Sequence, residues 1–152
     1  MKTRSMFAVV VTSLLLGTAT NYAADTAASI SMNQMRESHP RMRMMDRAGS
    51  IHKIVDKQLS TGMTAKASAD AFVRDWAVAL NADANGFIEQ GPFIDGRHEQ
   101  GLMYNHQTGE YKFTGFYYTQ TVAGLPVYDS RLMVLVRNAK TVSYTHLTLP
   151  TK

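Results

Sequence analysis

Apolar positions recur with two different periods along the chain, and the change comes near Gly86. Between Ala65 and Leu80 apolar side chains recur at spacings of 4, 3, 1, 3 and 4, which gives one continuous stripe on a helix. Thr64 can cap this helix. We interpret Trp76, the single tryptophan, as a core anchor because such a large ring buries much apolar area. The pattern therefore predicts an amphipathic helix with its stripe turned to the core: Ala65, Ala69, Phe72, Val73, Trp76 and Leu80.

A shorter helical pattern is expected to precede it. Ser50 can cap this pattern, in which Ile51, Ile54, Val55 and Leu59 share one face. The sequence Ser60-Thr61-Gly62 then interrupts it.

After Gly86 the residue types favour strands. We expect a short extended run at residues 102–104, a turn at 105–109, a strand at 110–121, a turn at 122–124 and a strand at 127–136. The order predicts an α+β fold, an N-terminal helix packed on an antiparallel meander of about three strands. Alternation divides the first long strand into one face with Tyr111, Phe113, Tyr117 and Thr119 and another with Phe116, Tyr118 and Gln120.

The N-terminus has the pattern of a secretory signal peptide. Lys2 and Arg4 precede an apolar run of 11 residues from Met6 to Leu16, and small residues follow up to Ala23. This run is too short to cross a bilayer of about 30 Å as a helix. We therefore expect a signal peptide at residues 1–23, secretion or export to a periplasm, and no stable membrane anchor after cleavage.

Charge and cysteine content narrow the possible functions. Without Lys2, Arg4 and Lys152, the 16 basic residues fall to 13 against 12 acidic residues, a balance of +1. This near balance argues against a nucleic-acid partner. The chain has no cysteine, so an exported domain would have to fold without disulfides.

Residues 24–49 read as a flexible linker rich in Met and Arg, because small polar residues come first and Pro40 and Gly49 interrupt regular structure. Thioethers are soft ligands for Cu(I), so the methionines between Met32 and Met45 leave copper binding as an alternative to a simple leader.

No motif of catalysis is present: there is no H-E-x-x-H, no G-x-S-x-G, no Gly-rich phosphate loop and no cysteine nucleophile. We therefore expect this chain not to be an enzyme and to hold no cofactor. Residues 81–86 resemble the first half of a calcium loop, but Asn81 replaces the first Asp and Pro92 stands where the closing Glu is needed. The alternative is that Asn81 and Gly86 end the preceding helix.

The C-terminal residues depart from the strand pattern. Residues 143–152 resemble a translated sequencing-adapter tail, and we group Val142 with them. We therefore interpret 142–152 as a non-native tail and expect the domain to be truncated near Thr141.

The stretch 112–134 resembles the fungalysin/thermolysin propeptide family. The resemblance lies in an aromatic strand that ends in Gln, a short turn, and then a Gly-x-Pro-Val-aromatic segment before an apolar strand. The matching residues are Gln120, Gly124, Pro126, Val127, Tyr128, Leu132 and Val134. On this resemblance, residues 50–141 form a truncated propeptide-like domain.

The resemblance implies a pro-region of an exported zinc metallopeptidase, acting as an intramolecular inhibitor and folding aid. Its partner would be its own downstream peptidase domain, which would also hold the zinc. We expect Phe116, Tyr118 and Gln120 to contact that partner, while packing within the domain is the alternative role for Phe116 and Tyr118. The alternative function is a stand-alone secreted binding module that uses the same sheet as a docking surface.

Overall fold

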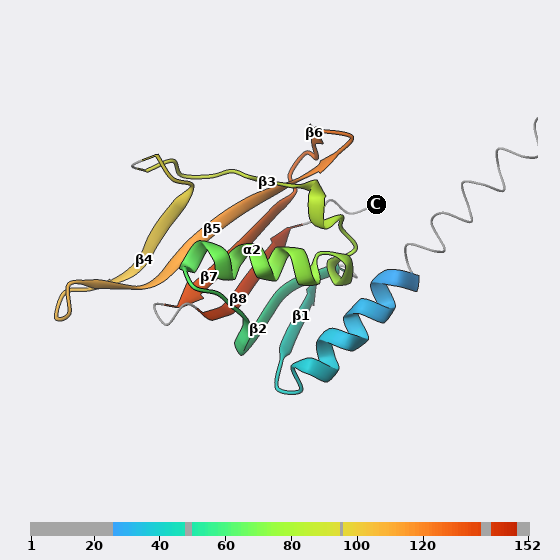
Figure 1. The fold of residues 1–152 in the computed structure, drawn as a ribbon, viewed down its shortest axis with the longest axis horizontal. Helices are drawn as coiled ribbons and strands as arrows, with labels where there is room; N and C mark the ends of the chain where they lie inside the picture. The colour runs from blue at the N-terminus through green and yellow to red at the C-terminus, as the bar shows by residue number, and fades with distance from the viewer. Residues whose placement is uncertain (1–25, 48–49, 95, 138–140, 149–152) are drawn as a thin grey trace, which may run out of the picture.

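The computed structural model describes residues 26–47, 50–94, 96–137 and 141–148, which form an antiparallel sheet with helices on one face (Figure 1). The α+β class is thus confirmed, whereas the signal peptide expected at residues 1–23 lies outside the described residues. Following a helix at 26–38, the elements are β1 (Arg43–Arg47), β2 (Ser50–Thr61), α2 (Ala65–Trp76), 3-10 turns at Val78–Leu80 and Ala84–Gly86, β3 (Phe87–Glu89), β4 (Glu99–Asn105), β5 (Glu110–Val122), β6 (Leu125–Pro126), β7 (Arg131–Arg137) and β8 (Thr141–Thr148).

The described strands form one sheet in the order β1-β2-β8-β7-β5-β3. β4 lies on the same edge of β5 as β3, because β3 pairs with residues 118–120 and β4 with residues 110–116. β4, β5, β7 and β8 are successive antiparallel neighbours, so the predicted meander is confirmed and is one strand longer than expected. β2 pairs with the edge of β8 that β7 does not occupy.

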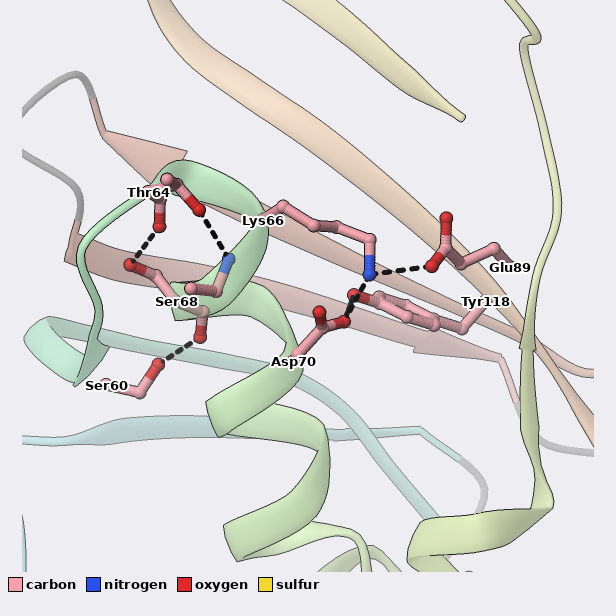
Figure 2. Close-up of polar contacts among 8 residues, drawn as sticks. Ser60, Thr64, Lys66, Ser68, Asp70, Glu89 and Tyr118 are labelled. Carbon is pink, nitrogen blue, oxygen red and sulfur yellow. Dashed lines mark hydrogen bonds and ion pairs between the residues drawn. The ribbon is translucent and has the colours of Figure 1, made fainter. Parts of the chain in front are cut away.

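α2 begins where the apolar stripe predicted it but ends at Trp76, and Leu80 at the end of the stripe lies in the 3-10 turn that follows. The Thr64 side chain accepts a hydrogen bond from the Ala67 backbone N–H at 3.0 Å, which caps the first turn (Figure 2). Asn81 ends the helical segment in the left-handed conformation, with a φ of 57°. The helix-stop interpretation of this segment is thus supported for Asn81. The Asp83 carboxylate, in the same segment, accepts a hydrogen bond from the Asn85 backbone N–H at 2.9 Å.

One row of side chains across the sheet shows which face α2 covers. Ile54, Thr145, Val134 and Phe116 stand opposite one another on β2, β8, β7 and β5, and each is at most 2% exposed. Ile54, Val134 and Phe116 belong to a single core with Phe72 of α2. Trp76 packs against this core and donates its indole N–H to the Leu59 carbonyl at 3.4 Å, as a core anchor would.

The helix predicted from Ser50 onward is wrong, because residues 50–61 form β2. Ile54 and Leu59 both reach the core although five positions separate them, which regular strand alternation does not allow. The register with β8 shifts between Val55 and Ser60, and this irregularity restores the core-facing direction. The apparent helical spacing was therefore produced by an interrupted strand.

The flexible linker expected at 24–49 is also wrong where the structure describes it. Residues 26–38 are helical, and β1 pairs antiparallel with β2. Met32 and Met35 lie one helical turn apart and are buried in the core, so they act as structural side chains. Pro40 follows the last helical bond, from the His39 N–H to the Met35 carbonyl at 2.9 Å, and so ends the helix without disrupting it.

The sheet does not end near Thr141 as expected. Residues 141–148, which include most of the adapter-like segment, form β8 between β2 and β7. Val142 is fully buried and Thr145 is 1% exposed, so β8 contributes to the core. The non-native origin of residues 142–152 stays a prediction.

Candidate functional site

The part of the propeptide-like stretch from Gln120 to Tyr128 contains a tight hairpin at the end of β5, whereas Leu132 and Val134 lie in β7. Thr121 stands opposite Pro126 and Val122 opposite Leu125, so only Ala123 and Gly124 make the turn. Both have positive φ, 51° and 78°, as a two-residue type I′ hairpin turn requires. The local sequence therefore sets a sharp reversal that carries β6 back along β5.

A hydrogen-bonded brace holds the base of this hairpin. The Gln120 backbone N–H donates to Ser130 Oγ at 3.0 Å, and the Ser130 hydroxyl donates to the Val127 carbonyl at 3.0 Å. The Val127 N–H donates to the Gln120 carbonyl at 2.8 Å. Ser130 is only 5% exposed, so the brace is shielded from water.

Three apolar side chains of the hairpin face solvent. Val122 is 62% exposed, Leu125 71% and Tyr128 93%. We name these three side chains, with the backbone turn that presents them, the signature hairpin. Large apolar side chains gathered on a braced projection are typical of a contact surface rather than of a core.

A groove of about 880 Å³ lies beside the signature hairpin. Its floor includes Tyr117 and Thr119 of β5, and its walls come from Gln90–Pro92 and from the Tyr128–Arg131 segment. The Thr119 hydroxyl donates to the Gln90 side-chain oxygen, and the Gln90 N–H donates to the Tyr117 carbonyl at 2.9 Å. The wall that follows β3 is thereby held against the sheet.

Two of the three residues expected to contact a partner are buried. Phe116 is 2% exposed and Tyr118 4%, because both lie on the face of β5 that α2 covers. Packing within the domain is therefore their role, and the docking prediction for these two side chains is wrong. Gln120 is half-buried, and its backbone takes part in the brace.

Tyr118 also belongs to a polar network that joins α2 to the sheet (Figure 2). Lys66 Nζ lies 2.5 Å from Asp70 Oδ1 and 2.6 Å from Glu89 Oε1, and the Tyr118 hydroxyl donates to Asp70 Oδ1 at 3.0 Å. Sequence reasoning missed this network. The i,i+4 spacing of Lys66 and Asp70 was a signal for one pair, but nothing local points to Glu89 or Tyr118.

The network shifts two ionisation equilibria. Burial lowers the pKa of Lys66, but its hydrogen bonds and charge interactions with Asp70 and Glu89 outweigh burial and hold that pKa above the ordinary lysine value. Burial raises the pKa of Tyr118 well above the usual phenol range, and the negative charge of Asp70 adds to the shift. Both groups are therefore protonated in the folded protein around neutral pH.

The part of the chain that the structure describes contains no group of three or more His, Cys, Asp or Glu side chains that could hold a metal ion. Within the same residues, no helix is long and apolar enough to cross a membrane.

Comparison with known proteins found no matching family model, no matching curated protein and no matching solved structure.

Proposed function

We propose that this chain is the pro-region of an exported zinc metallopeptidase precursor, where it assists folding of the peptidase domain and keeps it inactive until removed. The observation that carries the proposal is the geometry of the signature hairpin. The residues that resemble the propeptide motif, from Gln120 to Tyr128, come together in one braced unit that presents apolar side chains to solvent. Under this proposal the downstream domain holds the zinc, and the described chain binds to that domain.

A stand-alone secreted binding module is the second candidate. The groove beside the signature hairpin favours it, because a concave surface of about 880 Å³ with polar and aromatic walls is suited to a peptide or other extended ligand. Under this candidate the same hairpin would border a ligand site instead of contacting a peptidase domain.

The first experiment is to read the source locus through the codons for residues 138–152 and beyond. A reading frame that continues into a domain with an H-E-x-x-H helix supports the pro-region. A genuine stop codon shortly after residue 148 supports the binding module and contradicts the pro-region.

The second experiment measures inhibition of that downstream peptidase domain by this chain added in trans. We expect the wild-type chain to inhibit, and Tyr128→Ala and Leu125→Ala each to weaken inhibition about tenfold, because truncating a central apolar contact typically costs about 1–2 kcal/mol. Met63→Ala is the matched control, since Met63 is 86% exposed and lies outside the hairpin. Equal inhibition by all three variants would contradict a role for the signature hairpin.

A further inference from the structure

The sheet has one face that no described helix covers. Met32 and Met35 of the 26–38 helix and Phe72 of α2 enter the same core, so both helices pack on one side of the sheet. In Figure 1 this is the side on which α2 crosses the strands. Strand alternation turns the neighbouring side chains to the opposite side. These half-buried apolar side chains define the open face: Val55 of β2, Leu102 of β4, Phe113 and Tyr117 of β5, and Met133 and Leu135 of β7.

The open face is continuous at its centre. A Cβ built on Gly115 would lie 3.1 Å from a Leu102 methyl, 3.4 Å from a Leu135 methyl and 3.5 Å from the Tyr117 ring. Side chains of three neighbouring strands therefore meet over this glycine. The groove beside the signature hairpin borders the same face, since Tyr117 lines it.

Charge is divided between the two sides of the sheet. The acidic side chains of β2, β3 and β4 lie on the helix side, where Asp56 pairs with His39 at 3.5 Å, Glu89 with Lys66 at 2.6 Å, and Glu99 with Arg97 at 3.1 Å.

The open face has basic margins instead. Arg43 stands opposite Val55 at one margin, and Arg131 lines the groove with Tyr117 at the other. Asp129 also lines this groove, but Arg137, opposite Phe113, adds a further basic side chain to the face. Among the described residues neither Arg43 nor Arg131 forms an ion pair, and both are exposed.

The positive charge of these margins indicates which kind of partner the open face can bind. Two copies packed face to face would bring their basic margins together, which opposes self-association. Without Lys2, Arg4 and Lys152 the chain has 13 basic and 12 acidic residues, and this balance of +1 gives no general attraction for nucleic acid or anionic lipid. An apolar centre with a basic margin fits a protein surface with an apolar centre and an acidic margin.

We propose that the open face docks on an acidic-rimmed apolar surface of the peptidase domain, an inference that rests on the proposed function. The signature hairpin and the groove lie at the end of this face where β5 meets β6, so hairpin and face would contact one partner together.

The test measures the dissociation constant between the full chain and the purified peptidase domain encoded downstream, at low and at high salt. Arg131→Glu is expected to weaken binding about tenfold, mostly at low salt and through the association rate, because a margin charge steers encounter. Arg74→Glu is the matched control: it makes the same charge change on α2, where the Arg74 side chain is 70% exposed. It should leave binding within about twofold of wild type.

A second variant tests the centre of the open face independently of its margin. Met133→Glu places a negative charge in the centre of the open face and should weaken binding more than Arg131→Glu, with thermal unfolding of each variant measured alongside. If the wild-type chain inhibits the peptidase domain and both Arg131→Glu and Met133→Glu bind it like wild type, docking through the open face is overturned. The proposed function is then left intact. A wild-type chain that neither binds nor inhibits would overturn the proposed function itself.

Other partners of the open face would give different binding results. Self-association of the chain that Met133→Glu abolishes would assign the open face to a second copy and overturn the proposal. Binding to phosphatidylglycerol vesicles or to single-stranded RNA that is tighter than to the peptidase domain, and lost in Arg131→Glu, would overturn it in favour of those partners.

Discussion

At the residue scale, the backbone at Ala123 is the feature of the signature hairpin most open to improvement. Ala123 has a φ of 51°, a left-handed conformation that costs a residue with a Cβ about 1 kcal/mol, whereas Asn adopts it readily. We expect Ala123→Asn to raise the free energy of unfolding by about 0.5–1 kcal/mol, measured by urea denaturation. The gain would come from the turn alone, because no new contact is required.

The same substitution elsewhere provides the control. Ala67 is exposed within α2, where Asn is a weaker helix former, so Ala67→Asn should lower the free energy of unfolding by about 0.5 kcal/mol. Opposite signs for the two variants would establish that backbone conformation is the cause. A loss of stability in Ala123→Asn would contradict the turn geometry described above.

At the element scale, the Lys66–Asp70–Glu89–Tyr118 network joins α2 to β3 and β5 and makes stability depend on alkaline pH. Because the pKa of Lys66 is raised on folding, its contribution is complete below the ordinary lysine value of 10.5 and is lost as pH rises through the folded value. The raised pKa of Tyr118 acts in the same direction above its ordinary value of 10.0. We expect the free energy of unfolding to fall as pH rises above about 10.

Tyr118→Phe separates the two contributions. It removes the buried phenol but keeps the ring in the core, so the alkaline loss of stability should become shallower while the Lys66 part remains. Urea denaturation at a series of pH values measures this slope. Tyr111→Phe removes an exposed hydroxyl and serves as the control, and an unchanged slope in Tyr118→Phe would refute the assignment.

At the scale of the whole molecule, β8 connects the two halves of the sheet. β2 and β7 each pair with β8, and no other described strand lies between them. A chain of residues 24–141 would therefore leave two unpaired strand edges and remove Val142 and Thr145 from the core. We expect this shortened chain to show no cooperative thermal transition by circular dichroism, in contrast to the full chain.

The origin of residues 142–152 can be tested on the same basis. If the source locus encodes a different strand at this position, a chain that carries the encoded residues should unfold cooperatively. The reason is that any strand between β2 and β7 must hydrogen-bond to both of them and turn apolar side chains toward the core. A cooperative transition in residues 24–141 alone would show that the sheet does not depend on β8.

Local patterns predicted part of this fold well. Thr64 and the apolar stripe locate α2, and Asn81 ends the 3-10 turn that follows it, so each of these signals depends on neighbouring residues. The turn at Ala123 and Gly124 is equally local, since two residues between strands favour one reversal. The sequence could not reveal the brace at Ser130, because its partner, the backbone of Gln120, is ten positions away and is met only once the hairpin forms.

Long-range packing decided the rest. Both faces of β5 carry aromatic residues, so alternation alone cannot say which face is buried; contact with α2 selects Phe116 and Tyr118 and leaves Tyr117 on the open face. β2 imitates a helix because its register shifts, and a shift exists only against β8. The sequence by itself determined the α+β class, α2 and the signature hairpin, since each is set by residues close in the chain. Only the tertiary structure decided the helical state of residues 26–38, the buried face and the charged margins, because these depend on partners far away in sequence.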